Sequence, residues 1–443
     1  MCEQIAPPYE NSRHEGNGVN WILAISLEAR MAALFVLGAA LGGLANLAAY
    51  RLAWNRRAIS PLSAPDAKAP PRHWFDRVPI FGWLGLWRET PLHGRGFWVR
   101  PMAVELAAAF GLAWLYSWEV ADAGLLPAGL RGQAPAAWLT AMHAQFAAHT
   151  LLAWLMLVAT LIDLDEKTIP DAITVSGTLA GLLVMWLWPG VALPDASGLF
   201  GQNALPPVCP TMVFSSPGAA PGWPGGFPTV WPLIVGLGCW TLWCFGLLRR
   251  DWYTRHGLGR AVKLCLARLG RDPSTVWIGA LAIGGAGVIA AAWAIGGRGW
   301  SSLVTALVGM AGAAGLVWAV RLIGAAAMRR EAMGFGDVTL LGMIGVFIGW
   351  QASVLVFFLA PLVAVVVGLV RYTLCRDKEI PYGPFLCLAA LFVLVRWDAV
   401  WDWARPMFTP DWLVPCALVI CMVLLGVLLG LWQAVKRLLF HRP

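Results

Sequence analysis

Long apolar runs alternate with shorter polar segments along most of this chain. A helix that crosses a bilayer needs about 20 mostly apolar residues, because the hydrocarbon core is about 30 Å thick. The pattern therefore predicts an all-α, polytopic integral membrane protein with about eleven transmembrane helices. We expect these helices near residues 31–50, 101–118, 145–162, 172–189, 229–248, 276–296, 302–325, 338–350, 352–370, 383–396 and 412–435.

The composition supports a membrane protein. Of the 443 residues, 59% are hydrophobic and only 13% are charged, which is more apolar surface than a soluble protein can bury. The 27 Trp and 48 Gly fit interfacial aromatic belts and close helix packing. The nine cysteines form no CxxC pair, so we interpret them as small buried hydrophobic residues.

The distribution of Lys and Arg predicts the orientation. Basic residues concentrate in 51–100, 249–271, Arg329 and Arg330, the stretch from Arg371 to Lys378, and the tail from Lys436 to Arg442, whereas 190–228 has none. By the positive-inside rule, the basic set is cytoplasmic, the N-terminus is outside and the C-terminus is cytoplasmic. The net charge of +8 is then a topology signal with contact to lipid, and no nucleic-acid partner is expected.

The first twenty residues are polar and lack the layout of a cleavable signal, so the first spanning helix is expected to anchor the chain.

The pattern of apolar and polar segments divides the chain into five regions. The regions are a polar N-terminal segment (1–30), an N-terminal region with a loop at 51–100 (31–144), the helices around Asp163 (145–190), an insertion with an outer loop, a basic loop and extra helices (191–325), and a C-terminal region that contains Asp337 (326–443).

Two aspartates at the edges of apolar segments carry the candidate chemistry. Asp163 ends one predicted span and Asp337 begins another, on the same predicted side. A carboxylate near hydrocarbon costs roughly 2.5–3.5 kcal/mol at a helix centre, so it is a functional hypothesis by default. An aspartic protease needs at least two neighbouring carboxyl groups, one of which stays protonated while the other carries the negative charge.

The residues around the two aspartates suggest how a site is shaped. Gly334 and Gly336 would let backbone and substrate approach Asp337 closely. Pro170 makes a break between two spans, and Asp171 after it is a natural helix N-cap that could also orient a substrate. The alternative is that Asp337 only caps its helix and that Asp163 is an interfacial acid facing water.

Several segments resemble the type IV prepilin peptidases. The C-terminal ones are Met333-Gly334-Phe335-Gly336-Asp337-Val338 and Glu379-Ile380-Pro381-Tyr382-Gly383-Pro384, and the central ones are Ile162-Asp163-Leu164 and Ile169-Pro170-Asp171. In the N-terminal part, Gly42 to Arg51, Trp74 to Ile80 and Pro101 to Leu106 are similar to that family's first helix and loop flanks. The resemblance covers roughly 35–190 and 325–395.

The resemblance implies a multi-pass aspartic endopeptidase of the inner membrane, with its active site facing the cytoplasm. Such enzymes remove the short basic leader of prepilins and pseudopilins, and many methylate the new N-terminus with S-adenosylmethionine. Asp163 and Asp337 would be the catalytic pair, and no cofactor is needed for proteolysis. Gly334, Gly336, Pro170, Asp171, Pro381, Gly383 and Pro384 would shape the site around the substrate.

The chain departs from the family pattern in three ways. Residues 51–100 lack the two CxxC pairs that bind zinc in the family, and only His73 and His93 remain there, so zinc is not expected and methylation is left open. Thr339 replaces a Lys that commonly follows the GxGD motif. The gap between the aspartates is longer than usual, which is the reason for proposing the insertion at 191–325.

Two other functions remain alternatives. One is a catalytically inactive membrane scaffold of a pilus or type II secretion system. The other is an ion-coupled transporter with the aspartates as cation sites, although transporters often show internal repeats and acids at the midplane, and neither is seen here. The sequence does not identify the prepilin-like substrate, the role of residues 191–325 or the oligomeric state.

Overall fold

The computed structural model is all-helical, as the sequence predicts. It describes residues 22, 24–57, 59–196, 199, 205–206, 208–217, 230–248, 273–328, 333–374, 381–410 and 412–440. Within these ranges the only pairing of extended backbone is one isolated bridge between Pro194 and Thr211. The basic stretch 249–271, Arg329 and Arg330, most of the polar N-terminal segment and residues 441–443 lie outside the described residues.

Seven described helices are long and apolar enough to cross a membrane. They are α2 (Leu27–Leu52), α6 (Trp138–Glu166), α8 (Val230–Leu247), α10 (Pro273–Ile295), α11 (Gly297–Met328), α12 (Phe335–Leu374) and α15 (Leu413–Phe440). The pair α13 (Gly383–Val395) and α14 (Trp397–Phe408), bent by 93°, raises the count to as many as eight if it forms one span. A multi-pass membrane protein is therefore supported, but the count of eleven is not confirmed.

Two of the expected spans differ from the structure for physical reasons. The helix at the expected span 101–118 is α5 (Val99–Tyr116), which carries Arg100 and the buried Glu105 and is not among the candidate spans. The helix at 172–189 is α7 (Asp171–Leu187), whose 17 residues place it among the shorter apolar helices. At about 1.5 Å per residue, α7 falls short of the hydrocarbon thickness.

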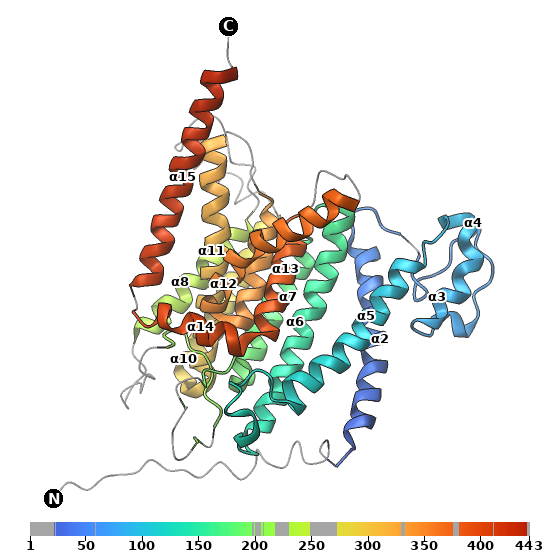
Figure 1. The fold of residues 1–443 in the computed structure, drawn as a ribbon, viewed down its shortest axis with the longest axis horizontal. Coiled ribbons are helices and arrows are strands. Elements are labelled where there is room, and N and C mark those ends of the chain that lie inside the picture. Colours follow the sequence, from blue (N-terminus) through green and yellow to red (C-terminus); the bar gives the residue numbers. More distant parts are fainter. Residues whose placement is uncertain are drawn as a thin grey trace, which may run out of the picture.

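The helices form one bundle with a small lobe at its side (Figure 1). α6, α7, α12 and α13 occupy the middle, α11 packs along α12, and α15 lies at the margin against α11. The pair α2 and α5 borders the opposite margin and carries the lobe, residues 54–98, which we call the basic lobe. Its short helices are η1 (Trp74–Arg77), α3 (Phe81–Gly85), η2 (Leu86–Glu89) and α4 (Thr90–His93).

The first half of α12 is the most deeply buried helix segment of the bundle. Leu340, Leu341 and Ile344 have no exposed surface. Its contact with α11 depends on glycine, because a Cβ on Gly309 would lie 2.1 Å from the Gly345 carbonyl oxygen. Small residues of this kind let two backbones approach closely in a membrane. This close contact fixes the first half of α12, which carries Asp337, against α11.

The chain folds back at Gly349 within α12. Gly349 has φ 77° and ψ 171°, a conformation that favours glycine, and it divides the element into two helices. A straight α12 would extend about 58 Å. The nine-residue step from Leu374 to Gly383 spans at most about 32 Å. Gly383 lies beside Asp163, since a Cβ on Gly383 would be 2.5 Å from the Asp163 carboxylate, and Asp163 is near the start of α12. The second half of α12 therefore returns toward the end where Asp337 lies.

Buried hydrogen bonds hold the turn at Gly349 to an irregular segment of the expected outer loop. The Gln351 side-chain amide donates to the carbonyl oxygens of Val213 (2.9 Å) and Ser216 (3.1 Å). The Trp350 indole donates to the Phe214 carbonyl at 2.7 Å. These bonds satisfy backbone groups that would otherwise be buried without partners. The described part of 190–228 is thus irregular, as expected, and packs on the bundle.

Candidate active site

Asp163 lies on the last turn of α6, and its carboxylate is buried with 4% of the residue exposed. α6 ends because Lys167 adopts a left-handed conformation, with φ 55°. Pro170 then takes an extended conformation and begins the turn into α7. The sequence between the two helices therefore ends α6 at Glu166, shortly after Asp163, and turns the chain into α7.

Asp337 lies on the first turn of α12 and is 7% exposed. The two glycines before it have different surroundings. Gly334 is exposed, and a Cβ there would lie 3.7 Å from the Asp337 carboxylate. A Cβ on Gly336 would lie 2.9 Å from the Cβ of Ile169, so this glycine lets the turn after α6 pack against the start of α12. The two motif segments are therefore in direct contact.

The start of α13 completes the site from a third direction. The Gly383 backbone N–H faces the Asp163 carboxylate. A Cβ on Gly383 would lie 2.5 Å from Asp163 Oδ2 and 3.0 Å from Ile169 Cδ1. Only a residue without a side chain allows this approach. The Oδ2 atom of Asp163 is buried and makes no hydrogen bond within the described part of the chain.

The carboxylates of Asp163 and Asp337 lie close enough to interact electrostatically. The buried thiol of Cys387, one turn into α13, interacts with both. Tyr382, just before α13, lies beside Asp337. Burial, together with the Asp337 charge, raises the pKa of Tyr382 to about 12, so its hydroxyl stays protonated at neutral pH. Three segments far apart in the sequence thus converge on one pair of acids.

The remaining residues that the sequence nominated lie at the edges of this site. Pro381 and Pro384 flank Tyr382 and Gly383, with Pro384 in the first turn of α13. The expectation that Asp171 is the N-cap of the next helix is wrong by one position. Pro170 is the N-cap, because its carbonyl accepts the first bond of α7 from Ile173 N at 3.0 Å, and Asp171 is the first helical residue. At that position its charge favours the helix N-terminus.

Parts of this chain are similar to known proteins. Residues 273–369, which include Asp337, match the type IV leader peptidase family. The prepilin leader peptidase/N-methyltransferases of Aeromonas salmonicida and Aeromonas hydrophila are 35% and 36% identical over 91 residues. The protein of the same name from Pseudomonas putida is 22% identical over 395 residues, which cover 83% of this chain and 90% of that protein. The chain is therefore similar to the type IV leader peptidases, most clearly in residues 273–369.

The extent of these matches differs. The alignments to the Aeromonas prepilin leader peptidases cover 20% of this chain and 30% of those proteins. The family match begins at residue 273, so it includes α11 as well as the start of α12 that carries Asp337, whereas Asp163 lies outside it. No solved structure matches this chain.

Two acids after Asp163 make contacts that the sequence did not reveal. These acids are Asp165 and Glu166, in the last turn of α6. Glu166 accepts hydrogen bonds from the backbone N–H groups of Trp54 (2.6 Å) and Asn55 (2.7 Å), at the entry to the basic lobe. Asp165 pairs with Arg100, at the exit from the lobe. The segment that carries Asp163 is thus bound to both ends of the basic lobe.

A third acid, Glu105 on α5, anchors the basic lobe to the bundle. It is 2% exposed and accepts hydrogen bonds from the Trp83 indole at 2.7 Å, from Ile80 N at 2.5 Å and from the Asn46 side chain at 3.5 Å. A buried carboxylate is tolerated when donors surround it in this way. The apolar pattern of α5 gives no sign of these partners, which come from two separate segments: Asn46 from α2, and Ile80 and Trp83 from the start of α3.

Replacing Glu105 by Gln should loosen the basic lobe. The amide presents N–H atoms where the carboxylate accepts, so at least one buried donor loses its partner, at a cost of about 1–3 kcal/mol. We expect trypsin to cleave the Glu105→Gln protein faster at Arg77, in the lobe, than the wild type. Glu28→Gln, at the exposed start of α2, is the control and should leave the cleavage rate unchanged. Equal rates for wild type and Glu105→Gln would contradict this anchoring role.

The residues of the basic lobe do not fit a zinc site. The two histidines are occupied separately, since the His73 ring stacks on Phe75 and His93 Nε2 lies 3.3 Å from Glu89. In the described ranges no three His, Cys, Asp or Glu side chains group as metal ligands. Two ion pairs to buried carboxylates hold the lobe together. Arg72 pairs with Glu89 at 2.7 Å, and the exposed Arg88 pairs with Asp76 at 2.5 Å.

We therefore expect metal chelators to leave this lobe folded. Treatment of the purified protein with EDTA should change neither the trypsin digestion pattern of residues 54–98 nor the thermal unfolding temperature. A structural zinc site would behave differently, because removal of the metal unfolds such sites. Loss of protection on chelation, with recovery on adding zinc, would contradict the ion-pair account.

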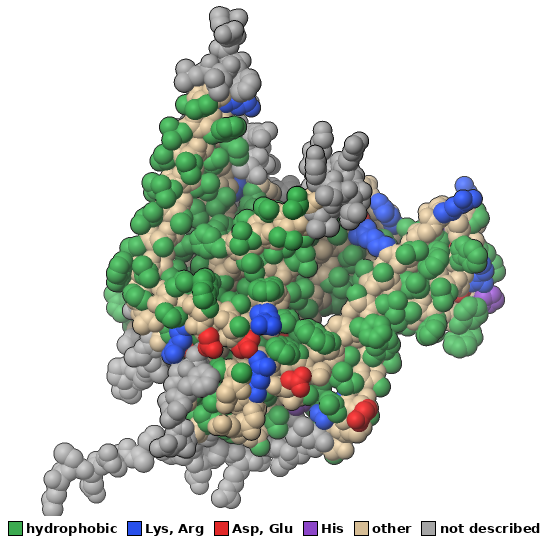
Figure 2. Space-filling model, viewed as in Figure 1, with side chains coloured by type: hydrophobic (Ala, Val, Ile, Leu, Met, Phe, Trp, Pro, Cys, Tyr) green, Lys and Arg blue, Asp and Glu red, His purple; other side chains and the backbone are tan. Residues whose placement is uncertain are grey.

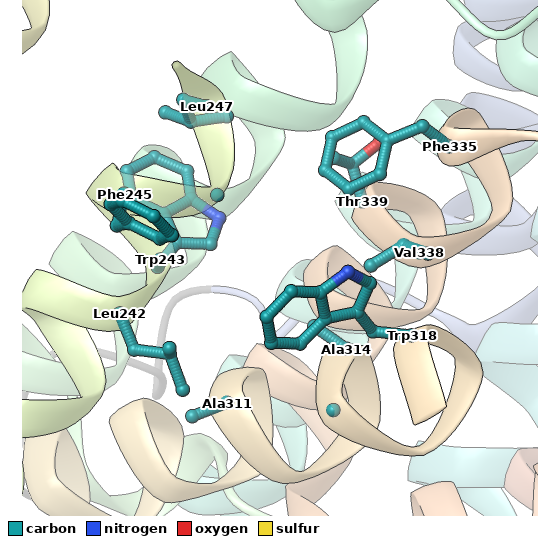
Figure 3. A pocket seen from close by; sticks show the side chains of 12 residues that line it. Leu242, Trp243, Phe245, Leu247, Ala311, Ala314, Trp318, Phe335, Val338 and Thr339 are labelled. Carbon is teal, nitrogen blue, oxygen red and sulfur yellow. The ribbon is translucent and has the colours of Figure 1, made fainter. Parts of the chain in front are cut away.

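An apolar pocket lies on another face of the first turn of α12 (Figure 3). Phe335, Val338 and Thr339 line it from α12, opposite Trp243 of α8 and Trp318 of α11. The Thr339 hydroxyl is not directed to a ligand, because it donates to the Gly336 carbonyl at 3.0 Å. The pocket offers no charged group for the sulfonium, amino and carboxylate groups of S-adenosylmethionine. It suits an apolar side chain or a lipid chain instead.

Proposed function

We propose that this protein is a membrane-embedded aspartic endopeptidase that removes the short basic leader of prepilin-like or pseudopilin-like proteins. Asp163 and Asp337 are the catalytic pair. The observation that carries the proposal is the meeting of two buried aspartates, each from its own motif segment, at one end of the bundle. The names of the homologous proteins supply the substrate class.

The pair would divide the work of peptide hydrolysis. Two close acids cannot both ionise cheaply, so one carries the charge while the other keeps its proton. The charged acid takes a proton from water as the water oxygen bonds to the scissile carbonyl carbon, and the other acid protonates the carbonyl oxygen. When the C–N bond breaks, the departing nitrogen takes the proton that the first acid removed from water. A hydroxyl of the intermediate returns its proton to the other acid as the carboxyl product forms, which restores the pair.

The environment around the pair supports this chemistry. The Gly383 N–H facing Asp163 favours the charged form of that acid. Tyr382 lies near Asp337, where its hydroxyl is available as a hydrogen-bond donor to the substrate. Gly334 is exposed beside Asp337, and Pro381 and the buried Pro384 flank Tyr382 and Gly383. A substrate segment there would extend between α12 and the start of α13.

The proposal includes a location in the cell. The enzyme would span the inner membrane with the site on the cytoplasmic side, the basic lobe on that side, the N-terminus outside and the C-terminus inside. The distribution of Lys and Arg supports this orientation. The break at Gly349 supports counting 338–350 and 352–370 as two separate helices. The substrate helix would remain in lipid while its leader reaches the site from the cytoplasm.

Mass spectrometry of a prepilin produced together with this protein in membranes tests the proposal. We expect the prepilin to lose its leader at one peptide bond. The same spectrum shows whether the new N-terminus gains a methyl group, which requires S-adenosylmethionine as a second substrate. An intact prepilin across a panel of type IV and type II secretion substrates would favour the scaffold alternative instead.

A further inference from the structure

The basic lobe exposes aromatic side chains to an unusual degree for a segment outside the candidate spans. Trp54 is 92% exposed, Trp74 81%, Phe81 69% and Trp87 67%. Phe81, Leu84 and Trp87 follow one another at helical spacing through α3 and η2, so they share a face. The neighbouring Trp83 and Leu86 are fully buried and form the core of the lobe. The exposed aromatics are therefore not needed to hold the lobe together.

The exposed charges around these aromatics are mostly positive. The exposed basic residues of the lobe are Arg56, Arg57, Lys68, Arg77, Arg88 and Arg95. Of its acids, Asp76 and Glu89 are buried in ion pairs, which leaves Asp66 as the exposed one. Figure 2 shows hydrophobic side chains covering the lobe, with Lys and Arg at its edges. The surface thus combines aromatic residues with positive charge.

The position of the lobe brings this surface to the membrane. α2 is a candidate span that ends at Leu52, two residues before Trp54, and α5 receives the chain again at Val99. The lobe lies to the side of the bundle, beyond α2 and α5 (Figure 1), and not as an extension of the helix ends. Glu166 and Arg100 hold its two ends at the level of the last turn of α6. It therefore extends over the lipid next to the bundle.

We propose that the basic lobe docks on the anionic surface of the bilayer that α2 crosses. Trp54, Trp74, Phe81 and Trp87 insert at the headgroup level, and the surrounding Arg and Lys side chains contact lipid phosphates. Trp is enriched at this depth of a membrane, and each Lys or Arg near an anionic surface strengthens binding roughly fivefold. A basic prepilin leader fits the surface less well, because like charges repel.

Hydrogen exchange of the full-length protein in nanodiscs tests the docking. We expect backbone amides of residues 73–93 to exchange several-fold more slowly in nanodiscs that contain phosphatidylglycerol than in phosphatidylcholine alone. High salt should reduce the difference, because it screens the attraction to anionic lipid. The triple variant W74S/F81S/W87S should lose the protection while peptides from α6 and α12 exchange as in the wild type.

Trp114→Ser provides a matched control, since Trp114 is 51% exposed on α5 outside the lobe and its removal should leave the protection of 73–93 intact. Equal exchange in both lipids would overturn the proposal. So would protection that requires an added prepilin, which would identify the surface as a protein-binding site. The test does not depend on peptidase activity, so its failure leaves the proposed function standing.

Discussion

Asp163→Asn and Asp337→Asn should each lower the rate of leader cleavage by about 10²–10⁴-fold, the usual contribution of a positioned acid or base. Asn preserves the shape of the side chain but cannot exchange a proton at neutral pH. Both residues are buried at helix ends, and Asn fills the same space as Asp. The variants are therefore expected to remain folded and inserted. The measurement is the initial rate of cleavage of a purified prepilin in proteoliposomes.

Asp402→Asn is the control for this pair. Asp402 is an exposed carboxylate on α14, away from the two motif segments, and its replacement should leave the rate unchanged. Cleavage at the wild-type rate by both dyad variants would remove the chemical basis of the account.

Gly383→Ala should reduce the turnover rate by about 10²-fold, the effect of displacing a reacting group by about 1 Å. The added Cβ would lie 2.5 Å from Asp163 Oδ2, which real side chains do not tolerate, so the carboxylate must move. The same added Cβ would also lie 3.0 Å from Ile169 Cδ1, so a second neighbour crowds the Ala side chain. We expect kcat to fall more than KM rises, because the methyl group disturbs the acid and not the entrance to the site.

Gly368→Ala is the matched control for the glycine variant, because a Cβ at this position in α12 meets no atom within 4 Å. It should cleave like the wild type. Full activity of Gly383→Ala would show that Asp163 is not held where the structure places it.

The sequence predicted the all-α membrane class and the meeting of Asp163 and Asp337. Both predictions rest on local signals, namely long apolar runs and short motifs beside Pro170 and Gly336. The same signals did not predict the partners of buried acids, since Glu105 binds Trp83 and Ile80, and Glu119 pairs with His149 at 2.9 Å. Such pairs join helices through tertiary packing, which periodicity along one chain does not encode.

The number of spans was harder to predict for a related reason. Hydropathy treats each apolar run alone, so it placed a span at 101–118, where α5 uses Glu105 to anchor the basic lobe. It also separated 338–350 from 352–370 without identifying the cause. That cause is the backbone of Gly349, whose positive φ and hydrogen-bonded neighbours Trp350 and Gln351 produce the turn.

A double-mutant cycle on the two aspartates tests most directly whether they act as one unit. Cleavage rates are measured for wild type, Asp163→Asn, Asp337→Asn and the double variant in the same proteoliposomes. If the two acids share one hydrolytic step, the double variant should be no slower than the slower single variant, because removing either acid already abolishes the shared step. Losses that multiply in the double variant would show that the two carboxylates act independently and would contradict the account.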